Sequence, residues 1–400
     1  MGRLIQGLAT EEGRVTAIAT TRTAIASETT ANAPRILELD GLRGIAIALV
    51  LIHHFFYFAP GAPLGWSGVD LFFVLSGFLI GGILLDARAS PNYFKTFYAR
   101  RALRILPIYY TWIGAYVLVM AIAGRFLEAH VPGGGGGWEM LSTMSGQVLF
   151  LQNFHTLAYS SVIGGTWFLS TWSLAVEEQF YIIAPLVIQF LTRRWLFLFL
   201  GIVILSAPML RSYIHYHLPL RPSHDLSLAY TLMPCRADSL AMGVLTALLW
   251  RNHGFRMWLK EHGSVLLIAA TVFFAGVGAL CKWAPYHESL VEQSAGYTWI
   301  AIFYTLVILL ALSKPSSWLA YLTRMAWLRE LGKISYCVYL IHMAVGMFCQ
   351  ALLIGLLRRV SSWQFIAANC GAVVLTYAIA RLSWAYFENP LLQKGHKYQY

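Results

Sequence analysis

The chain has 400 residues, of which 58% are hydrophobic and only 12% are charged, and its mean hydropathy is +0.61. Soluble domains typically carry about 25% charged residues, so this composition excludes an ordinary soluble protein and indicates one that is integral to a membrane. The net charge of +11 would also suit a nucleic-acid-binding protein. In a chain with many spans, however, Lys and Arg collect in cytoplasmic loops for topological reasons, and we do not expect nucleic-acid binding.

Residues 1–36 mix Arg, Glu, Thr and Ala without the apolar core of a signal peptide, and we expect them to form a disordered cytoplasmic tail. Apolar runs of membrane-spanning length follow, with a period typical of helices. Backbone polar groups in lipid must be satisfied within each segment, so the predicted fold is all-α, a polytopic helical bundle over residues 37–390. Residues 391–400 are expected to form a second short cytoplasmic tail. The candidate helices are 44–59, 68–85, 105–124, 140–155, 167–191, 195–213, 229–250, 264–281, 296–313, 334–357 and 363–387.

The fourth candidate, 140–155, is short and rich in Ser, Thr and Gln, and the distribution of charge decides against it as a span. If it does not cross and the N-terminus is cytoplasmic, most of the 29 Lys and Arg residues lie inside. The outside loops then keep only Arg125, Arg211, Arg221, Lys282, Arg358 and Arg359. If residues 140–155 did cross the membrane, every later loop would change sides, and the excess of Lys and Arg on the cytoplasmic side would disappear. The sequence therefore predicts ten transmembrane helices with both termini in the cytoplasm, and an outside loop at 130–165 whose glycine run at 132–137 is a flexible connector.

Ionisable residues occur near the middle of several predicted spans. With a helical rise of about 1.5 Å per residue, His54 lies about 16 Å beyond Arg43, near the midplane of a hydrocarbon core about 30 Å thick. The same level is reached by Glu177, Glu178, Arg236, Asp238 and His342. Charged side chains at that depth are costly and usually functional, so we expect a water-accessible internal site. In the alternative, Arg236 forms a buried ion pair that only fixes helix packing, and His342 bonds a backbone carbonyl group.

Adjacent residues on a helix point about 100° apart, so Glu177 and Glu178 cannot both face one site. We expect one to line the site and the other to pair with Arg236 or a neighbour. His53 and His54 diverge in the same way. We interpret His53 as a packed or interfacial residue and His54 as a general base, because an imidazole titrates near neutrality and a nearby carboxylate can orient it.

A second group of charges lies in the stretch YARRALRILPIYY. Arg101 and Arg104 are spaced i, i+3, so they share one helix face at the cytoplasmic surface. Guanidinium pairs at this spacing suit phosphate or pyrophosphate oxygens. Topological signals and anionic lipid headgroups account for such clusters equally well. The five cysteines show no metal-ligand spacing, and we interpret them as packing residues and expect no metal.

Six blocks, taken together and in order, resemble the membrane-bound acyltransferase family 3, the bacterial O-acyltransferases that act on surface polysaccharides and related acceptors. The blocks are LDGLRGIAIALVLIHHF at 39–55, GVDLFFVLSGFLI at 68–80, RALRILPIYY at 101–110, TWSLAVEEQFYIIAPL at 171–186, CRADSLAMGVL at 235–245 and ISYCVYLIHM at 334–343. The resemblance covers nearly the whole chain and implies a ten-helix bundle in the bacterial cytoplasmic (inner) membrane. Cys337 stands where the family commonly has Ser, and Ser239 where it commonly has Gly.

By this resemblance, Arg43 and His54 match the arginine and the catalytic-type histidine of the family's first helix. Arg101 and Arg104 match its Arg-x-x-Arg motif, which is associated with acyl-CoA. The resemblance therefore implies an enzyme, an O-acyltransferase that moves an acyl group, most commonly acetyl, from acyl-CoA to a hydroxyl group of a carbohydrate or lipid-linked glycan.

We expect His54, Glu177, Glu178 and Arg236 to be catalytic, with Arg236 stabilising the oxyanion. The predicted acyl-CoA site contains Arg43, Arg101 and Arg104, and the candidate substrate-site residues are Asp70, Ser173, Asp238, His342 and Trp167, the last able to stack on a sugar ring. Transfer is either direct or through an acyl-enzyme on Ser76, Ser173 or Ser335, although no nucleophile elbow surrounds these serines. The alternative function is a proton-coupled secondary transporter or flippase, which explains the buried ionisable residues but not the arginine pair.

Overall fold

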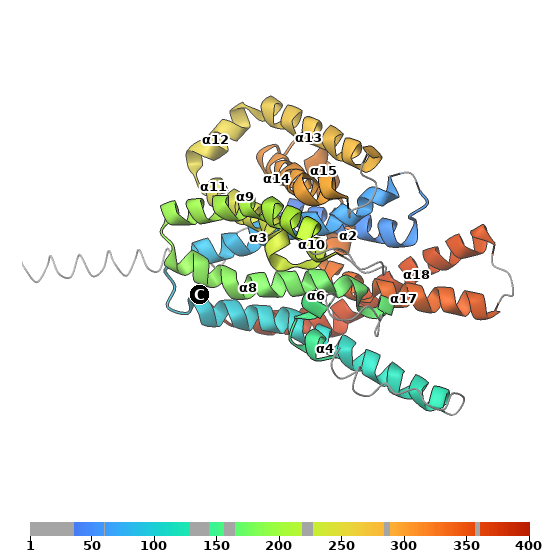
Figure 1. Cartoon of the computed structure of the whole chain (residues 1–400). Helices are drawn as coiled ribbons and strands as arrows, with labels where there is room; N and C mark the ends of the chain where they lie inside the picture. Colours follow the sequence, from blue (N-terminus) through green and yellow to red (C-terminus); the bar gives the residue numbers. More distant parts are fainter. Residues whose placement is uncertain are drawn as a thin grey trace, which may run out of the picture. The chain divides into compact units, whose positions relative to one another are not determined.

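The computed structural model describes residues 36–59, 61–128, 144–155, 165–217, 227–283, 289–356 and 361–400. Residues Glu38–Tyr400 form one compact unit. The described residues contain helices and no strand, which confirms the predicted all-α class (Figure 1). Apart from residue 36, the predicted N-terminal tail lies outside the described residues, as does the glycine run at 132–137.

The described helices fall into two halves of the chain. The first half contains α2 (Leu37–Phe55), η1 (Ala62–Ser67), α3 (Gly68–Ala87), α4 (Tyr93–Glu128), α6 (Gln152–His155), α7 (Gly165–Phe168), η2 (Leu169–Thr171), α8 (Trp172–Phe190) and α9 (Arg193–His217). The second half contains α10 (Leu228–Thr231), α11 (Met233–Trp250), α12 (His253–Glu261), α13 (Gly263–Trp283), the π-helix η3 (Glu292–Gly296), α14 (Tyr297–Ser313), α15 (Trp318–Arg324), α16 (Ala326–Lys333), α17 (Ser335–Leu356), α18 (Ser362–Ser383), the π-helix η4 (Trp384–Glu388) and α19 (Asn389–Gly395).

Eight helical stretches of the described chain are long and apolar enough to cross a membrane. They are Leu64–Ala87, Tyr93–Ile122, Arg193–His217, Leu228–Trp250, Gly263–Leu280, Glu292–Ser313, Ser335–Leu353 and Ser362–Gly395. The two predicted spans outside this set are occupied by α2 and α8, the helices that carry Arg43 and His54, and Glu177 and Glu178, respectively. Length and composition thus support eight of the ten predicted spans, and the other two are helices rich in candidate site residues.

The segment that charge excluded as a span is not a long helix. Its described part is helical over residues 144–148 and again in α6. Side-chain amides fix it against α8: Asn153 and Gln179 exchange hydrogen bonds of 3.3 and 2.9 Å. The segment is therefore a short insertion that packs against the bundle.

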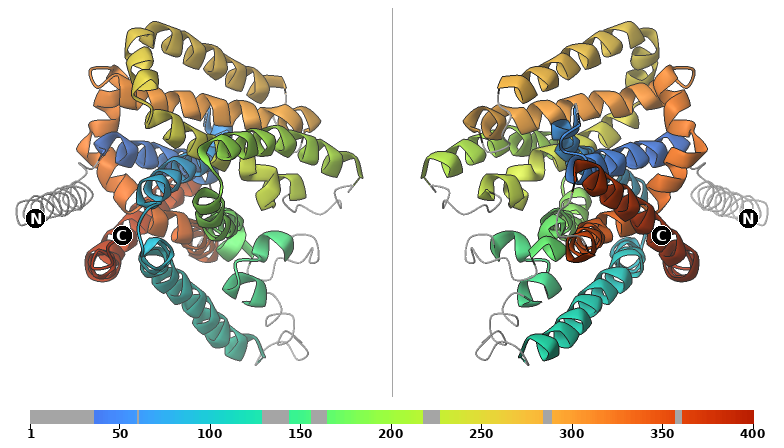
Figure 2. Two further views of the ribbon diagram at one scale, coloured as in Figure 1. Left: turned by 90° about the vertical axis from the view of Figure 1, so that its left-hand side faces the viewer. Right: turned by 90° about the vertical axis from the view of Figure 1, so that its right-hand side faces the viewer.

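Helices α2, α3 and α11 lie in the middle of the unit, with α13 on one side and α4 on the other (Figures 1 and 2). The closest approach of α3 and α11 occurs at Gly77 and Gly243. A Cβ atom at Gly77 would lie 2.1 Å from the carbonyl oxygen of Leu240, and one at Gly243 would lie 2.2 Å from that of Val74. Small residues permit such backbone contact between helices in lipid, and the two glycines set the distance between α3 and α11.

The charge count placed Arg211 with the outside loops, although it falls near the end of the predicted helix 195–213. The structure corrects the count: Arg211 lies within α9 and is fully buried. Its guanidinium donates to the carbonyl oxygens of Gln293 and Ser294 in the π-helix η3, and to Oδ2 of Asp238 at 3.0 Å. A π-turn leaves carbonyl oxygens without their α-helical partners. Arg211 satisfies these oxygens and therefore ties α9 to α11 and to the start of α14.

The predicted C-terminal tail, 391–400, is packed against α4. Thr96 Oγ1 donates to the carbonyl oxygen of Gln399 at 2.7 Å, and Arg100 donates to that of Tyr398 at 2.9 and 2.5 Å. These contacts place the end of the described chain beside the turn of α4 that carries Arg101.

Replacing Gly243 by Ala should destabilise the protein by about 1–3 kcal/mol or prevent its folding, because the added methyl group meets backbone atoms of α3 that cannot move aside. Gly114→Ala is the matched control, since no atom lies within 4 Å of the Cβ position at Gly114. The melting temperature in detergent, followed by size-exclusion chromatography, measures both variants. Equal stability of the two would contradict the close approach of α3 and α11.

Candidate functional site

The structure brings together two histidines from opposite ends of the chain, His54 on α2 and His342 on α17. Their ring centroids are 4.9 Å apart, and His342 Nε2 lies 3.3 Å from His54 Nδ1. His342 is fully buried, and its Nδ1 lies 2.7 Å from the carbonyl oxygen of Tyr339. His54 Nδ1 also lies 3.0 Å from the carbonyl oxygen of Val50. The histidine pair therefore has fixed backbone partners on both sides.

These contacts determine which nitrogens carry protons. A carbonyl oxygen only accepts hydrogen bonds, so Nδ1 of His342 is protonated and, in the neutral ring, Nε2 has a free lone pair. His54 Nδ1–H then donates to His342 Nε2 and to Val50, and the lone pair of His54 lies on its Nε2. His54 is thus held in the tautomer that a general base requires.

A carboxylate was expected to orient His54, and the structure corrects this expectation: the orienting partner is the imidazole of His342. His53, the adjacent histidine, instead has its Nδ1 3.3 Å from the carbonyl oxygen of Ala62. The arrangement follows from the helix geometry, because adjacent side chains on α2 point in different directions.

A cavity that reaches Tyr339, the residue in contact with His342, is lined by Glu177 and not by Glu178, and neither His54 nor His342 is among its lining residues. It is lined by Arg43, Val69, Phe72, Phe73, Ser173, Leu174, Glu177, Ser335, Tyr336 and Tyr339. Glu177 accepts hydrogen bonds from Ser76 Oγ at 2.6 Å and from the hydroxyl group of Tyr181 at 2.9 Å. Two donors of this kind fix the carboxylate of Glu177 and stabilise its charge.

Tyr339 links the cavity to the histidines and was missed at the sequence level. It lines the cavity, its hydroxyl group lies 2.6 Å from Ser173 Oγ, and its carbonyl oxygen is the one that contacts His342. The sequence feature that could have indicated Tyr339 is its position one helical turn before His342, which puts both residues on the same helix face. Ser335 lines the cavity too, but its hydroxyl group donates to the carbonyl oxygen of Gly332 at 2.9 Å.

Three arginines lie close enough together to interact, and one of them, Arg43, lines the cavity. The charges of Arg43 on α2 and of Arg101 and Arg104 on α4 interact with one another. Arg101 lies over the ring of Tyr181, with 4.9 Å from its Cζ to the ring centroid, and Arg43 interacts electrostatically with Glu177. Within the described residues, no hydrogen-bond acceptor or ion-pair partner is found for any of these three guanidinium groups.

Like charges brought together without acceptors are unfavourable unless an anion joins them. Guanidinium groups recognise phosphate oxygens with several parallel hydrogen bonds. The three arginines, which we call the arginine cluster, can therefore hold a phosphorylated ligand whose remaining part enters the cavity at Arg43.

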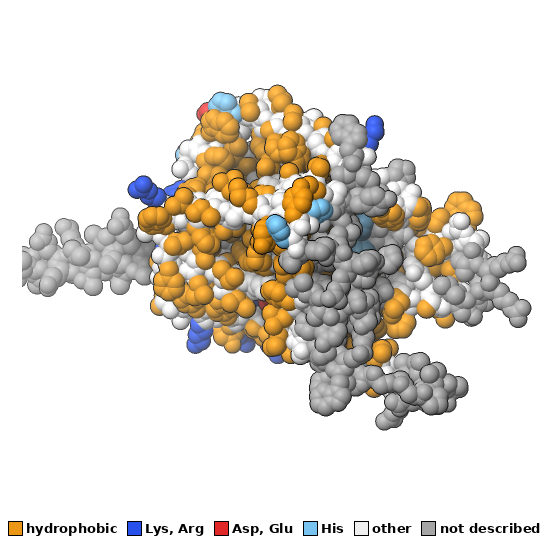
Figure 3. Space-filling model, in the orientation of Figure 1, with side chains coloured by type: hydrophobic (Ala, Val, Ile, Leu, Met, Phe, Trp, Pro, Cys, Tyr) orange, Lys and Arg blue, Asp and Glu red, His pale blue; other side chains and the backbone are white. Residues whose placement is uncertain are grey.

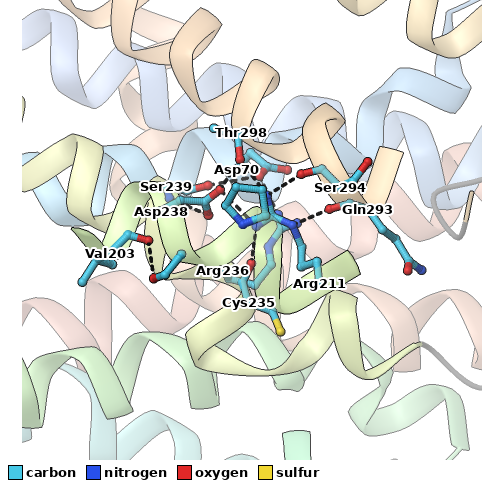
Figure 4. Close-up of polar contacts among 12 residues, drawn as sticks. Asp70, Val203, Arg211, Cys235, Arg236, Asp238, Ser239, Gln293, Ser294 and Thr298 are labelled. Atoms are coloured by element: carbon cyan, nitrogen blue, oxygen red, sulfur yellow. Dashed lines mark hydrogen bonds and ion pairs between the residues drawn. The ribbon is translucent and has the colours of Figure 1, made fainter. Parts of the chain in front are cut away.

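Arg236 does not join the histidines or Glu177. Its Nη2 donates to Oδ1 of Asp70 at 2.5 Å, both side chains are fully buried, and its guanidinium lies 4.3 Å from the ring centroid of Tyr297. Asp238 pairs with Arg211 at 3.0 Å, and Figure 4 shows both ion pairs side by side. The structure thus corrects the expected pairing of Arg236 with Glu177 or Glu178. It favours the alternative, a buried ion pair that holds α3 against α11.

The reason lies in the position of these groups along α3. Asp70 accepts a hydrogen bond from Arg236, whereas Ser76 donates one to Glu177. At about 1.5 Å per residue, these two positions on α3 are about 9 Å apart. The two sets of ionisable residues therefore lie at different depths, although the sequence placed them at one level.

Trp167, the remaining candidate, lies on α7 and is buried. Its ring stacks on that of Trp112, with the centroids 4.5 Å apart. Trp167 is thus part of an aromatic cluster.

The described residues contain no group of three or more His, Cys, Asp or Glu side chains that could hold a metal ion.

Comparison with known proteins identifies a family that this chain matches over most of its length. Residues 36–381 match the model of a protein family described as "Acyltransferase domain". The chain is 30% identical over 376 residues to the "Putative peptidoglycan O-acetyltransferase YrhL" of Bacillus subtilis, a match that covers 90% of this chain and 55% of that protein. It is 29% identical over 380 residues to the "Peptidoglycan O-acetyltransferase OatA" of Listeria monocytogenes, covering 90% of this chain and 56% of that protein.

The "O-acetyltransferase OatA" of Staphylococcus aureus is 27% identical over 393 residues, covering 91% of this chain and 58% of that protein. The chain thus spans little more than half the length of these relatives. No solved structure matches it significantly.

Replacing Asp70 by Ala should cost about 3–5 kcal/mol of stability, because it leaves the guanidinium of Arg236 buried without its partner. The double variant Asp70→Ala/Arg236→Met should recover most of that loss, since it removes both charges. Melting temperatures of the purified variants in detergent measure the effect. A single variant as stable as the parent protein would contradict a structural role for the Asp70–Arg236 pair.

Proposed function

The chain belongs to the membrane-bound acyltransferase family 3, and on that premise we propose that it transfers an acyl group, acetyl in the simplest case, from acyl-CoA to a hydroxyl group of a carbohydrate or glycan. The observation that carries the proposal is the histidine pair, which leaves Nε2 of His54 free to accept a proton. The relatives described as peptidoglycan O-acetyltransferases support a glycan as the acceptor.

In this proposal the arginine cluster binds the phosphate groups of acyl-CoA. The pantetheine arm then enters the cavity and brings the thioester towards the histidines. Arg43 and Glu177 both line the cavity and interact electrostatically. Glu178 lies outside the cavity lining and takes no step.

The chemical step is a direct transfer. Nε2 of His54 takes the proton of the acceptor hydroxyl group as its oxygen attacks the thioester carbon. The carbon–sulfur bond then breaks, and the thiolate of CoA receives that proton from His54. His342 keeps His54 in the reactive tautomer throughout, because its Nε2 accepts the hydrogen bond from His54 Nδ1.

We also propose that α2 and α8 cross the bacterial cytoplasmic membrane, which gives ten spans over residues 37–390 and places both termini in the cytoplasm. Arg43 then lies towards the cytoplasmic face, where acyl-CoA is found, and His54 lies near the middle of the membrane. Groups in the interior of a membrane bundle usually serve a transported or reacting ligand. The relatives named above are all described as O-acetyltransferases, so they do not support the alternative of a transporter.

Replacing His54 by Gln should lower acyl transfer at least about 100-fold, because it removes the proton acceptor while keeping a polar side chain of similar size. His53→Gln, one residue away, is the matched control and should stay active. The assay follows radiolabel from acetyl-CoA into a peptidoglycan-derived glycan, with purified protein in detergent. Activity of the His54 variant close to that of the control would show that His54 is not the general base of the reaction.

Replacing Arg101 and Arg104 together by Gln should raise the KM for acetyl-CoA about tenfold or more and leave the KM for the glycan unchanged, because the phosphate contacts are lost. Arg100→Gln is the control, since Arg100 instead donates to the carbonyl oxygen of Tyr398. An unchanged KM for acetyl-CoA in the double variant would mean that Arg101 and Arg104 do not bind acetyl-CoA and only help to set the membrane topology.

A further inference from the structure

An apolar groove lies between α8 and α9, two helices that follow each other along the chain. A connection of two residues, 191–192, joins them, and both pack against α11, but they have little contact with each other. The space between them is a cavity of about 250 Å³, lined by side chains of all three helices. Hydrophobic side chains cover the face of the molecule on which α8 and α9 lie (Figures 1 and 3).

The sequence of α11 explains why this groove is hollow. Pro234, Ala237, Ala241 and Val244 all line it, and they recur every three or four residues, so they share one face of α11. Two of the four are alanines, which leave space where larger side chains would fill the gap between α8 and α9. The floor of the groove is therefore this face of α11.

The lining of the groove is hydrocarbon almost throughout. Among the described residues that form it, Ser206 alone has a polar side chain, and its hydroxyl group donates to the carbonyl oxygen of Val203 on the same helix at 3.2 Å. An apolar cavity of this size stays dry and accepts an apolar molecule. The groove therefore suits a ligand made of hydrocarbon.

The groove is open on the side that faces away from α11. Leu200 and Leu240, deep in the groove, are 4% and 1% exposed, whereas Ile183 on α8 and Phe199 on α9 are 43% and 38% exposed. In a membrane, the medium around these two exposed side chains is the hydrocarbon of the lipid tails. A tail can therefore enter the groove from the side.

The length of the groove also fits a lipid tail. Along α9 its lining runs from Leu196 to Ser206, which corresponds to about 15 Å at the rise of an α-helix. This is about half of a hydrocarbon core about 30 Å thick, the share of one leaflet.

Positive charge lies at one end of the groove. Arg193 and Arg194 begin α9 and are exposed, and within the described residues no hydrogen-bond acceptor or ion-pair partner is found for either guanidinium. Arg193 is one helical turn before Leu196, so it shares the helix face that lines the groove. Trp195 is 58% exposed, as is typical of a residue at the membrane–water interface. In the topology proposed above, this end faces the cytoplasm.

Hydrogen bonds fix the segment that carries these two arginines. Arg88 Nη2 donates to the carbonyl oxygen of Gln189 at 3.1 Å and to that of Leu191 at 2.6 Å. The backbone N–H of Leu196 donates to the carbonyl oxygen of Thr192 at 2.8 Å, which closes the first turn of α9. The charged end of the groove is therefore built into the fold.

We propose that the groove binds one tail of an anionic phospholipid and that Arg193 and Arg194 hold its phosphate group. Guanidinium groups bind phosphate oxygens well, and positive residues at the membrane surface attract anionic headgroups. The groove shares no lining residue with the cavity that contains Glu177. Because α8 carries Glu177 and also forms one wall of the groove, the bound lipid supports a helix of the proposed reaction site.

The lipid carrier of a glycan fits this groove less well, although it also joins hydrocarbon to phosphate. With its phosphate at Arg193 and Arg194, its sugar would lie at the cytoplasmic end of α9. In the proposed topology His54 lies near the middle of the membrane, so the sugar would not reach it. A phospholipid has no such requirement.

Replacing Arg193 and Arg194 together by Gln should weaken the binding of phosphatidylglycerol about tenfold or more, because two charges at the headgroup are lost. The full chain in detergent is titrated with this lipid. Bound lipid is measured by native mass spectrometry, and the melting temperature should rise with the lipid concentration because the ligand binds the folded state. Lys394→Gln/Lys397→Gln removes the same charge from exposed positions near the end of the chain and is the matched control.

Replacing Ala237 by Leu tests the site of the tail. The larger side chain fills part of the groove, so it should weaken the binding of phosphatidylglycerol about tenfold. The melting temperature without added lipid should stay the same or rise, because filling an apolar cavity is usually stabilising. Ala275→Leu, at an exposed position of α13, is the matched control. If Ala237→Leu does not fold, the exposed arginine pair still decides the outcome.

Two probes separate the parts of the ligand. Phosphatidylethanolamine has the same tails without a net charge, and glycerol 3-phosphate has the phosphate group without tails. Neither should raise the melting temperature at concentrations at which phosphatidylglycerol does. Equal stabilisation by either probe would overturn the proposal, as would unchanged phosphatidylglycerol binding in the arginine variant. Tighter binding of a polyisoprenyl phosphate, in competition with phosphatidylglycerol, would also overturn it and assign the groove to the lipid carrier of a glycan.

Discussion

The contact of α3 with α11 at Gly77 and Gly243 is the constraint on which the rest of the bundle depends. Because the two backbones touch there, Asp70 on α3 reaches Arg236 on α11 and neutralises a charge that lipid cannot solvate. Further along α3, Ser76 donates to Glu177 on α8 and fixes the carboxylate that lines the cavity. One helix thus supports both a structural ion pair and a wall of the proposed reaction site. A change in the spacing of α3 and α11 would disturb both.

Buried charges in this protein are of two kinds, and the difference separates structure from proposed function. Asp70 with Arg236, and Asp238 with Arg211, form fully buried pairs that join helices. The arginine cluster gathers positive charges for which the described residues offer no hydrogen-bond acceptor or ion-pair partner. Unpaired positive charges favour an incoming anion. The Asp70–Arg236 pair is neutral as a whole, but in the described structure Nε and Nη1 of Arg236 and Oδ2 of Asp70 have no hydrogen-bond partner.

The sequence predicted the helical class and that residues 140–155 do not form a span, because composition and charge asymmetry act over whole segments. Counting residues along a helix gave only an approximate depth for each side chain. It did not show in which direction the side chain points or which helices lie next to it. For that reason Arg236 was placed at the same level as Glu177. In the structure its partner is Asp70, which lies about 9 Å along α3 from Ser76, the partner of Glu177. Arg211 was assigned to a loop because its partners, the carbonyl oxygens of η3, come from a distant part of the chain.

The partner of His54 is another neutral ring, and this has a consequence for the timing of the proposed reaction. A carboxylate beside the base would compensate the positive charge formed on protonation and allow the imidazolium ion to persist. His342 offers a dipole instead of an anion, so the imidazolium would be a short-lived species in an environment of low dielectric constant. Its proton would pass to the departing sulfur almost as soon as it arrived. An orienting group without charge would thus couple the departure of one product to the formation of the other, and would leave little opportunity for water to intercept the acyl group.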